Sequence, residues 1–109
     1  METLGYNNAP TELQVLSKIK RLYKNPNRWT KGTFSKQNGK ITCYCLSGAI
    51  THYYGGNSSD SWPLRNKMAK LVNESYISFF NDRPDTTIDD IRDLIDRAIN
   101  QIKQEKKNK

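Results

Sequence analysis

An amphipathic pattern near the C-terminal end of the chain predicts a long helix. Apolar residues recur three or four positions apart over residues 88–102, which is the spacing of one face of a helix. That face consists of Ile88, Ile91, Ile95, Ala98, Ile99 and Ile102. Thr87 can cap the helix, and Asp90, three residues later, gives an acidic variant of the capping box. A helix with one apolar stripe is expected to pack that stripe against the rest of the chain.

Turn and cap signals divide the rest of the chain into short elements. Asn38-Gly39 predicts a hairpin turn, because both central positions of that turn favour positive φ. Asn25-Pro26 ends a first helix, and Gly55-Gly56 ends a second. Residues 76–80 are expected to form either a third strand or a buried turn. The other expected elements are helices over residues 11–24, 45–54 and 62–73, the last with Pro63 in its first turn, and strands over 33–37 and 40–44.

These elements predict an α+β fold, in the form of a compact, mostly helical single domain with a small β-hairpin after the first helix. The length of 109 residues suits one domain with a modest core. Hydrophobic residues make up only 35%, but they are clustered and periodic, which argues against wholesale disorder. We expect one domain over residues 1–109, with flexible ends at residues 1–9 and 104–109.

The balance of charge favours anionic partners. The sequence holds 18 Lys and Arg against 11 Asp and Glu, a net charge of +7. No apolar run approaches the length of a membrane span, and the first ten residues lack the basic and apolar segments of a signal peptide. Cys43 and Cys45 are too few and too close together for a disulfide scaffold. We therefore expect a soluble, cytoplasmic protein with no membrane partner.

Three short motifs occur in a familiar order. They are Trp29-x-x-Gly32 before the hairpin, Cys45-x-x-Gly48-Ala49 at the second helix, and Asn81-Asp82 after the apolar stretch, followed by a helix that contains Arg97-Ala98. This order resembles a family of small proteins of unknown function found in actinobacterial and bacteriophage genomes. The resemblance extends from the first helix to Ala98 and implies no settled activity. It suggests that Trp29, Gly32, Cys45, Gly48, Asn81 and Asp82 form one unit, either a core or a site.

The segments between these elements also combine residue types that recognise nucleotides. Arg28 and Lys31 can bind phosphate, and Trp29 between them can stack on a base. Ser47 lies at a helix N-terminus, where free backbone N–H groups attract anions. Asn81 and Asp82 can hydrogen-bond a base edge or a ribose. The candidate ligand-binding residues are Arg28, Trp29, Lys31, Cys45, Ser47, Asn81, Asp82 and Arg83.

Each of these residues also has a structural interpretation. Trp29 can anchor the core, Gly48 can allow close packing of a helix, and Asp82 can accept backbone hydrogen bonds in a turn. No Walker loop and no dinucleotide-binding fingerprint is present in the sequence. The two interpretations therefore stay open at this stage.

Catalytic and metal chemistry are poorly supported by the sequence. Cys45 at a helix N-terminus resembles the nucleophile of a cysteine hydrolase, but it needs a general base. The one histidine, His52, lies two turns further along the same expected helix, about 10 Å away. The spacing of Cys43 and Cys45 does not suit a structural zinc site. We expect no catalytic residues, no metal and no cofactor.

The leading functional hypothesis is a non-enzymatic protein of phage type that sequesters an anionic, nucleotide-like small molecule, such as an immune signal. Such a protein is expected to form a homo-oligomer, because a small domain gains pocket walls from a neighbour. The first alternative is an accessory protein that binds nucleic acid or a host protein through its charge. A cysteine hydrolase is the third hypothesis.

Overall fold

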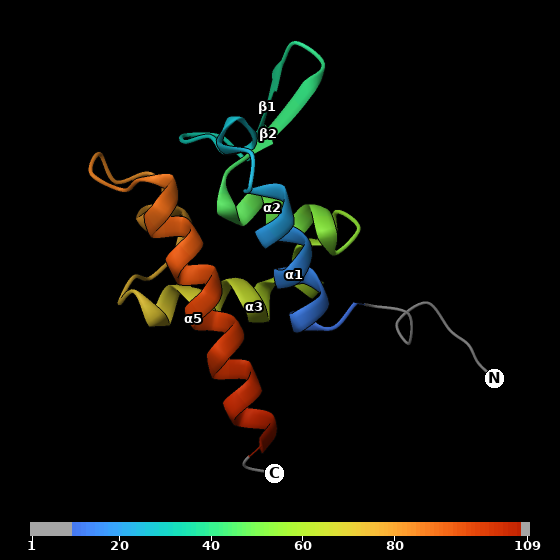
Figure 1. Cartoon of the computed structure of the whole chain (residues 1–109), viewed down its shortest axis with the longest axis vertical. Helices are drawn as coiled ribbons and strands as arrows, with labels where there is room; N and C mark the ends of the chain where they lie inside the picture. Colours follow the sequence, from blue (N-terminus) through green and yellow to red (C-terminus); the bar gives the residue numbers. More distant parts are fainter. Residues whose placement is uncertain (1–9, 108–109) are drawn as a thin grey trace, which may run out of the picture.

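A computed structural model describes residues 10–107, which fold into helices around one core with a two-stranded hairpin (Figure 1). The elements are α1 (Glu12–Leu22), a 3-10 turn η2 (Pro26–Arg28), β1 (Ser35–Asn38), β2 (Ile41–Tyr44), α2 (Leu46–Tyr53), α3 (Ser58–Leu71), α4 (Ile77–Asn81) and α5 (Ile88–Lys107). The predicted class is confirmed, because the domain is compact and mostly helical and the hairpin follows the first helix.

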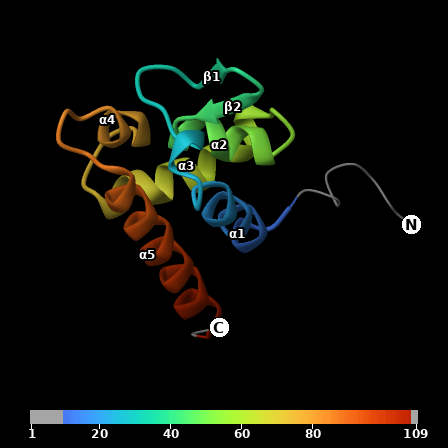
Figure 2. The same ribbon diagram turned by 45° about the horizontal axis from the view of Figure 1, so that its top comes forward.

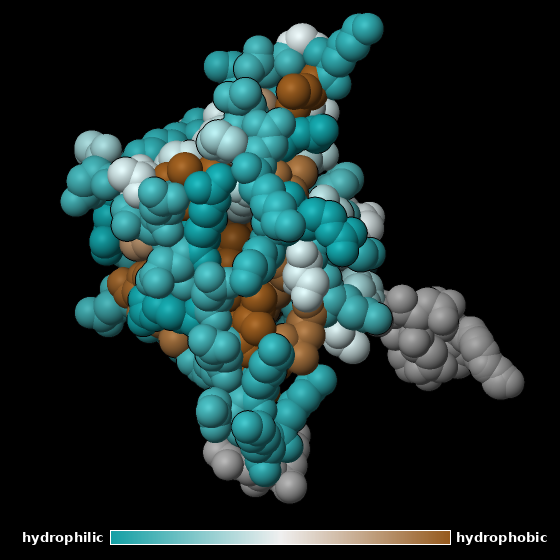
Figure 3. Space-filling model, in the orientation of Figure 1, coloured by the Kyte–Doolittle hydropathy of each residue, from teal (hydrophilic) through white to brown (hydrophobic). Residues whose placement is uncertain are grey.

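The long helix α5 forms one wall of the core, as its apolar stripe predicts. It packs against α1 and α3, and α2 packs against the same two helices (Figure 1). The buried side chains at this centre include Leu16, Ile19, Leu46, Ile50, Leu64, Met68, Ile91 and Ile95. Each fully buried Leu or Ile contributes roughly 1.5–3 kcal/mol to the stability of the fold. The surface in Figure 3 is mostly hydrophilic, and apolar residues show in small patches, the larger ones near the centre of this face.

Hydrogen-bonded caps define where the helices begin. Thr11 and Gln14 form a capping box at the start of α1, with each side chain bonded to the other residue's backbone N–H. At α5, the backbone N–H of Thr87 donates to Asp90 Oδ2 over 2.9 Å, and that of Asp90 donates to Thr87 Oγ1 over 3.2 Å. The predicted acidic capping box is therefore confirmed.

The hairpin extends from one end of the helical body, next to α2 (Figure 1, Figure 2). The predicted position of its turn, at Asn38-Gly39, was wrong by one residue. Asn38 is the last residue of β1 and pairs with Ile41, so Gly39 and Lys40 form the turn. Gly39 has a φ of +65°. A two-residue turn needs glycine at its first central position when the second keeps a negative φ, so Gly39 alone determines this turn.

Two further expectations about elements were wrong. Helix α3 begins at Ser58, four residues before the predicted start, because the Asn57 side chain accepts a hydrogen bond from Asp60 N and caps it. Pro63 consequently lies in the second turn of α3. Proline has no N–H group to donate to the Ser59 carbonyl, but Ser59 is at the exposed start of the helix. Residues 77–81 are neither a strand nor a turn but the short helix α4.

Most of the residues that we expected to form flexible ends lie outside the part of the chain that the structure describes. Residues 1–9 and 108–109 fall outside the described residues, whereas residues 104–107 are the last turn of α5. Within residues 10–107, no helix is both long enough and apolar enough to cross a bilayer.

Candidate functional site

The side chain of Asn81 lies at the centre of a buried junction between α4, the start of α2 and the segment after η2. Its Oδ1 accepts hydrogen bonds from Trp29 Nε1 over 2.6 Å and from Leu46 N over 3.1 Å. Its Nδ2 donates to the Thr30 carbonyl over 3.1 Å and to Asp82 Oδ1 over 2.9 Å. Asn81 is 0% exposed, so its full donor and acceptor capacity is used inside the protein. We call these five residues the Asn81 junction.

Neighbouring contacts extend this junction along the segment before the hairpin. Asp82 Oδ1 also accepts from Gly32 N over 2.9 Å, and Gly32 has a φ of +81° that favours glycine. Lys31 Nζ donates to the Arg83 carbonyl over 2.6 Å and lies 5.4 Å from the centre of the Trp29 ring. The Arg83 guanidinium forms an ion pair with Glu74. These predicted site residues do come together, and the polar groups named here contact one another or the backbone.

The start of α2 belongs to the same structural unit. Cys45 is the N-cap, and its Sγ accepts a hydrogen bond from Gly48 N over 3.3 Å. Two of the N–H groups that were expected to hold an anion, those of Leu46 and Gly48, are therefore already bonded. The structure thus brings together the residues of the three motifs, as the resemblance suggests.

The environment of Cys45 favours the neutral thiol. The residue is 3% exposed, and burial raises the pKa of its thiol, against smaller lowering contributions from nearby backbone N–H groups. The His52 ring instead stacks on Tyr44, with ring centres 4.8 Å apart. Among residues 10–107, no group of three His, Cys, Asp or Glu side chains is arranged to hold a metal ion.

Arg28 lies apart from the other predicted residues. Its Nη1 donates to the Thr42 carbonyl over 3.5 Å, and it lines a groove together with residues of α1 and α2. Of the predicted site residues, Ser47 alone lines a pocket between α2, α3 and the start of α4, which is the best candidate for a binding site.

That pocket is surrounded by exposed aromatic side chains. In the described part of the chain, the exposed large apolar side chains are Phe34, Trp62, Tyr76 and Phe79, each 43–56% exposed. They come from three separate segments, and three of them line a pocket of about 200 Å³. Exposed aromatic rings that gather in one place are typical of a binding surface. We call this the aromatic pocket.

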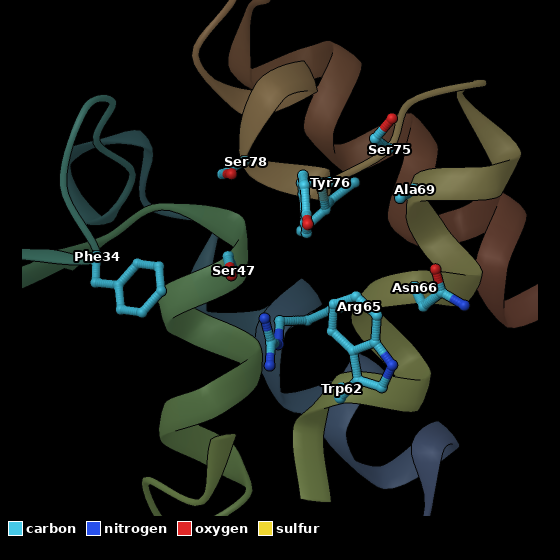
Figure 4. Close-up of a pocket in the computed structure, with 10 residues that line it drawn as sticks. Phe34, Ser47, Trp62, Arg65, Asn66, Ala69, Ser75, Tyr76 and Ser78 are labelled. Atoms are coloured by element: carbon cyan, nitrogen blue, oxygen red, sulfur yellow. The ribbon is translucent and has the colours of Figure 1, made fainter. Parts of the chain in front are cut away.

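Trp62 and Tyr76 of the aromatic pocket lie close to each other, Phe79 lies next to Tyr76, and one cation lies beside Trp62. The ring centres of Trp62 and Tyr76 are 6.3 Å apart, and those of Tyr76 and Phe79 are 5.3 Å apart. The Arg65 guanidinium carbon lies 5.3 Å from the centre of the Trp62 ring. Figure 4 shows Phe34 and Ser47 on one side of the pocket, with Trp62 and Arg65, from α3, on the other.

Arg65 is held in place by serine residues of its own helix. Its Nε donates to Ser61 Oγ over 3.0 Å, and its Nη2 donates to the Ser58 carbonyl over 2.9 Å. No described residue accepts a hydrogen bond from Nη1, and no acidic side chain lines the pocket. Burial lowers the pKa of Arg65, but a guanidinium stays charged at neutral pH. The pocket therefore presents one positioned, un-neutralised cation beside aromatic rings.

Gly48 connects the Asn81 junction to the aromatic pocket. The Phe34 carbonyl accepts a hydrogen bond from Cys45 N over 3.2 Å, which holds the Phe34 backbone against the first turn of α2. A Cβ atom at residue 48 would lie only 2.1 Å from the Phe34 oxygen. Glycine is therefore required for the close approach that leaves the Phe34 ring at the edge of the pocket.

Comparison with known proteins identifies the family. A model of a family of unknown function, DUF6197, matches residues 7–101. The chain belongs to DUF6197. No curated protein and no solved structure matches it. The expectation of a family of unknown function is confirmed by this match, whereas the actinobacterial and phage setting of the DUF6197 family stays a prediction.

Proposed function

We propose that this chain is a non-enzymatic binding protein whose aromatic pocket takes a planar, anionic group of a nucleotide-like small molecule. The observation that carries the proposal is that aromatic rings from three segments line one pocket together with Arg65, which no acidic side chain of the pocket neutralises. Rings stack on a planar group, and the Nη1 of Arg65, from which no described residue accepts a hydrogen bond, can donate hydrogen bonds to phosphate oxygens. The proposal keeps the predicted ligand chemistry and moves it away from the Asn81 junction.

The size of the pocket limits what it takes. About 200 Å³ is smaller than the roughly 300–1,000 Å³ of most small-molecule sites, so one ring system fits and the rest of the ligand extends outward. A second copy of the chain would supply further walls, which is the reason to propose a homo-oligomer. Capture of an immune signal, a phage origin and a cytoplasmic location rest on the sequence and its resemblance alone.

A protein partner is the second candidate for the same surface. Trp, Tyr and Arg are the residue types most enriched in the hot spots of protein interfaces. Trp62, Arg65 and Tyr76 combine all three types around one pocket, and the two aromatic residues are about half exposed. An aromatic side chain of a host protein would fill the same volume as a base.

A thermal-shift panel tests the first candidate. It uses mononucleotides, cyclic mono- and dinucleotides and ADP-ribose derivatives at one salt concentration. A ligand at 100 times its Kd adds about 2.7 kcal/mol, which raises the Tm by on the order of 10 °C in a domain of this size. Arg65→Gln should abolish the shift, whereas Lys70→Gln, an exposed site on the same helix, should retain it. The absence of a shift with every compound would overturn the nucleotide proposal and favour a protein partner.

A further inference from the structure

A basic groove lies between α1, η2 and the end of α2, and it shares no lining residue with the aromatic pocket. It measures about 550 Å³ and is lined by Lys18, Arg21, Leu22, Asn25, Arg28 and Tyr53. Three cations thus converge on one groove that no acidic side chain lines. Because like charges repel one another, such a groove is best stabilised by an anion.

The cations of the groove differ from their neighbour on the same helix. Lys20, on another face of α1, lies 2.8 Å from Asp96 in an ion pair. Within residues 10–107, Lys18, Arg21 and Arg28 form no ion pair. Their positive charge therefore remains available to a partner.

These charges gather around the ring of Tyr53. The Lys18 ammonium lies 6.0 Å from the ring centre. Burial raises the pKa of Tyr53, and the charges of Arg28 and Arg21 oppose that rise, so both guanidiniums lie close enough to influence its hydroxyl. The hydrogen bond from Arg28 to the Thr42 carbonyl holds one of these guanidiniums at the hairpin end of the groove.

A row of aromatic rings continues from Tyr53 beside the groove. The Tyr53 and His52 rings meet edge to face with centres 4.9 Å apart, and His52 stacks on Tyr44 at 4.8 Å. His52 is exposed and the two tyrosines are half-buried, so the row reaches the surface. Cations beside aromatic rings are the combination by which proteins bind a phosphate backbone and stack its bases.

We propose that the basic groove binds single-stranded nucleic acid, with the three cations on backbone phosphates and Tyr53 stacked against a base. A duplex hides the faces of its bases, so only a single strand uses both features of the groove. This function is separate from the proposed capture of a small molecule and does not depend on it.

Fluorescence anisotropy with a labelled thymidine 12-mer, between 50 and 200 mM salt, tests the groove. The variant Lys18→Gln/Arg21→Gln/Arg28→Gln is compared with a control that removes equal charge elsewhere, Lys36→Gln/Lys40→Gln/Lys103→Gln, at three exposed positions. We expect the groove variant to bind at least tenfold more weakly, with a salt slope lower by about 2, since each phosphate contact contributes about 0.7. The control should stay within threefold of the wild type. Equal weakening of both variants would overturn the proposal.

Tyr53→Leu tests the stacking separately. Stacking of one base on an aromatic ring predicts a loss of affinity of roughly fivefold to 100-fold, with the salt slope unchanged. A 12-base-pair duplex and inorganic pyrophosphate serve as competitors, and both should compete at least tenfold less well than the single strand. If either competes equally well, or if Tyr53→Leu has no effect, the groove does not recognise a single strand. Trp62→Ala should leave this affinity unchanged, so failure here is distinguishable from failure of the aromatic pocket.

Discussion

The Asn81 junction and the aromatic pocket contain opposite kinds of residue in opposite environments. At the junction, a buried asparagine uses its donors and acceptors on Trp29, Leu46, Thr30 and Asp82. At the pocket, aromatic rings remain about half exposed beside an arginine whose Nη1 has no described acceptor. The polar groups of the Asn81 side chain are therefore all hydrogen-bonded within the protein, whereas the pocket has exposed rings and a charged group that a ligand can contact.

Residue type alone therefore does not identify a site. Asn, Asp, Cys and Trp are typical of binding sites, yet here they connect α4, α2 and the segment after η2. Groups that are fully bonded inside a protein have nothing left to offer a ligand, and breaking their bonds leaves buried polar atoms unsatisfied. Substitutions in the junction should therefore lower stability, whereas substitutions in the pocket should lower binding.

Asn81→Ala should destabilise the protein most. It removes four hydrogen bonds and leaves Trp29 Nε1, Leu46 N and the Thr30 carbonyl without these partners. Leaving buried polar groups unpaired costs about 1–3 kcal/mol each, so we expect a loss of about 3 kcal/mol or more in the free energy of unfolding. Urea denaturation measures it, with exposed Asn100→Ala as the control. A loss below about 1 kcal/mol would show that the junction does not hold the fold together.

Gly48→Ala should affect both regions at once. The new methyl group would meet the Phe34 carbonyl at 2.1 Å, so the segment before β1 must move away from α2. Overpacking of this kind costs about 1–3 kcal/mol, and the movement also displaces the Phe34 ring from the pocket. Ser47→Ala, at the preceding position, is the control for urea denaturation. A Gly48→Ala protein as stable as that control would contradict the close approach of the two backbones.

The thiol of Cys45 should be inert in the folded protein. Because burial raises the pKa of the Cys45 thiol, the folded protein keeps this thiol neutral. The free energy of unfolding therefore has its full value below the ordinary thiol pKa of about 8.5. It falls as the pH rises above that value, because the unfolded chain then loses a proton that the folded protein retains. Cys43→Ser leaves Cys45 as the single thiol and preserves a donor for the Asn27 carbonyl. At pH 8, we expect iodoacetamide to react with it at least 100-fold more slowly than after denaturation. Comparable rates in the two states would revive the hydrolase hypothesis.

The sequence predicted the fold to the extent that local signals determine it. The apolar stripe and the Thr87–Asp90 capping box lie within one helix, so spacing alone was sufficient to find them. The start of α3 was missed because Asn57 is a strong cap, whereas Pro63 suggested a later start. The short helix α4 has no side-chain cap, and its five residues are too few to show a period.

The site was harder to predict because its contacts join distant parts of the chain. Trp29 and Asn81 are 52 residues apart, and no local pattern shows that their side chains meet. The motif order did suggest one unit, but it did not decide between a core and a site. One signal for the aromatic pocket was present: Trp62 lies off the apolar stripe that Leu64 and Met68 form on α3, and a tryptophan off the stripe stays exposed.

The ligand affinity of the Trp62→Ala protein shows whether the aromatic pocket is the binding site. Isothermal titration would use the compound that gives the largest shift in the nucleotide panel, with Tyr53→Leu as a control outside the pocket. Because Trp62 is 43% exposed, its loss should change the free energy of unfolding by less than about 1 kcal/mol. Its loss should also weaken binding at least tenfold, as removal of an aromatic hot spot does. An unchanged affinity in a folded Trp62→Ala protein would contradict the assignment of the aromatic pocket as the binding site.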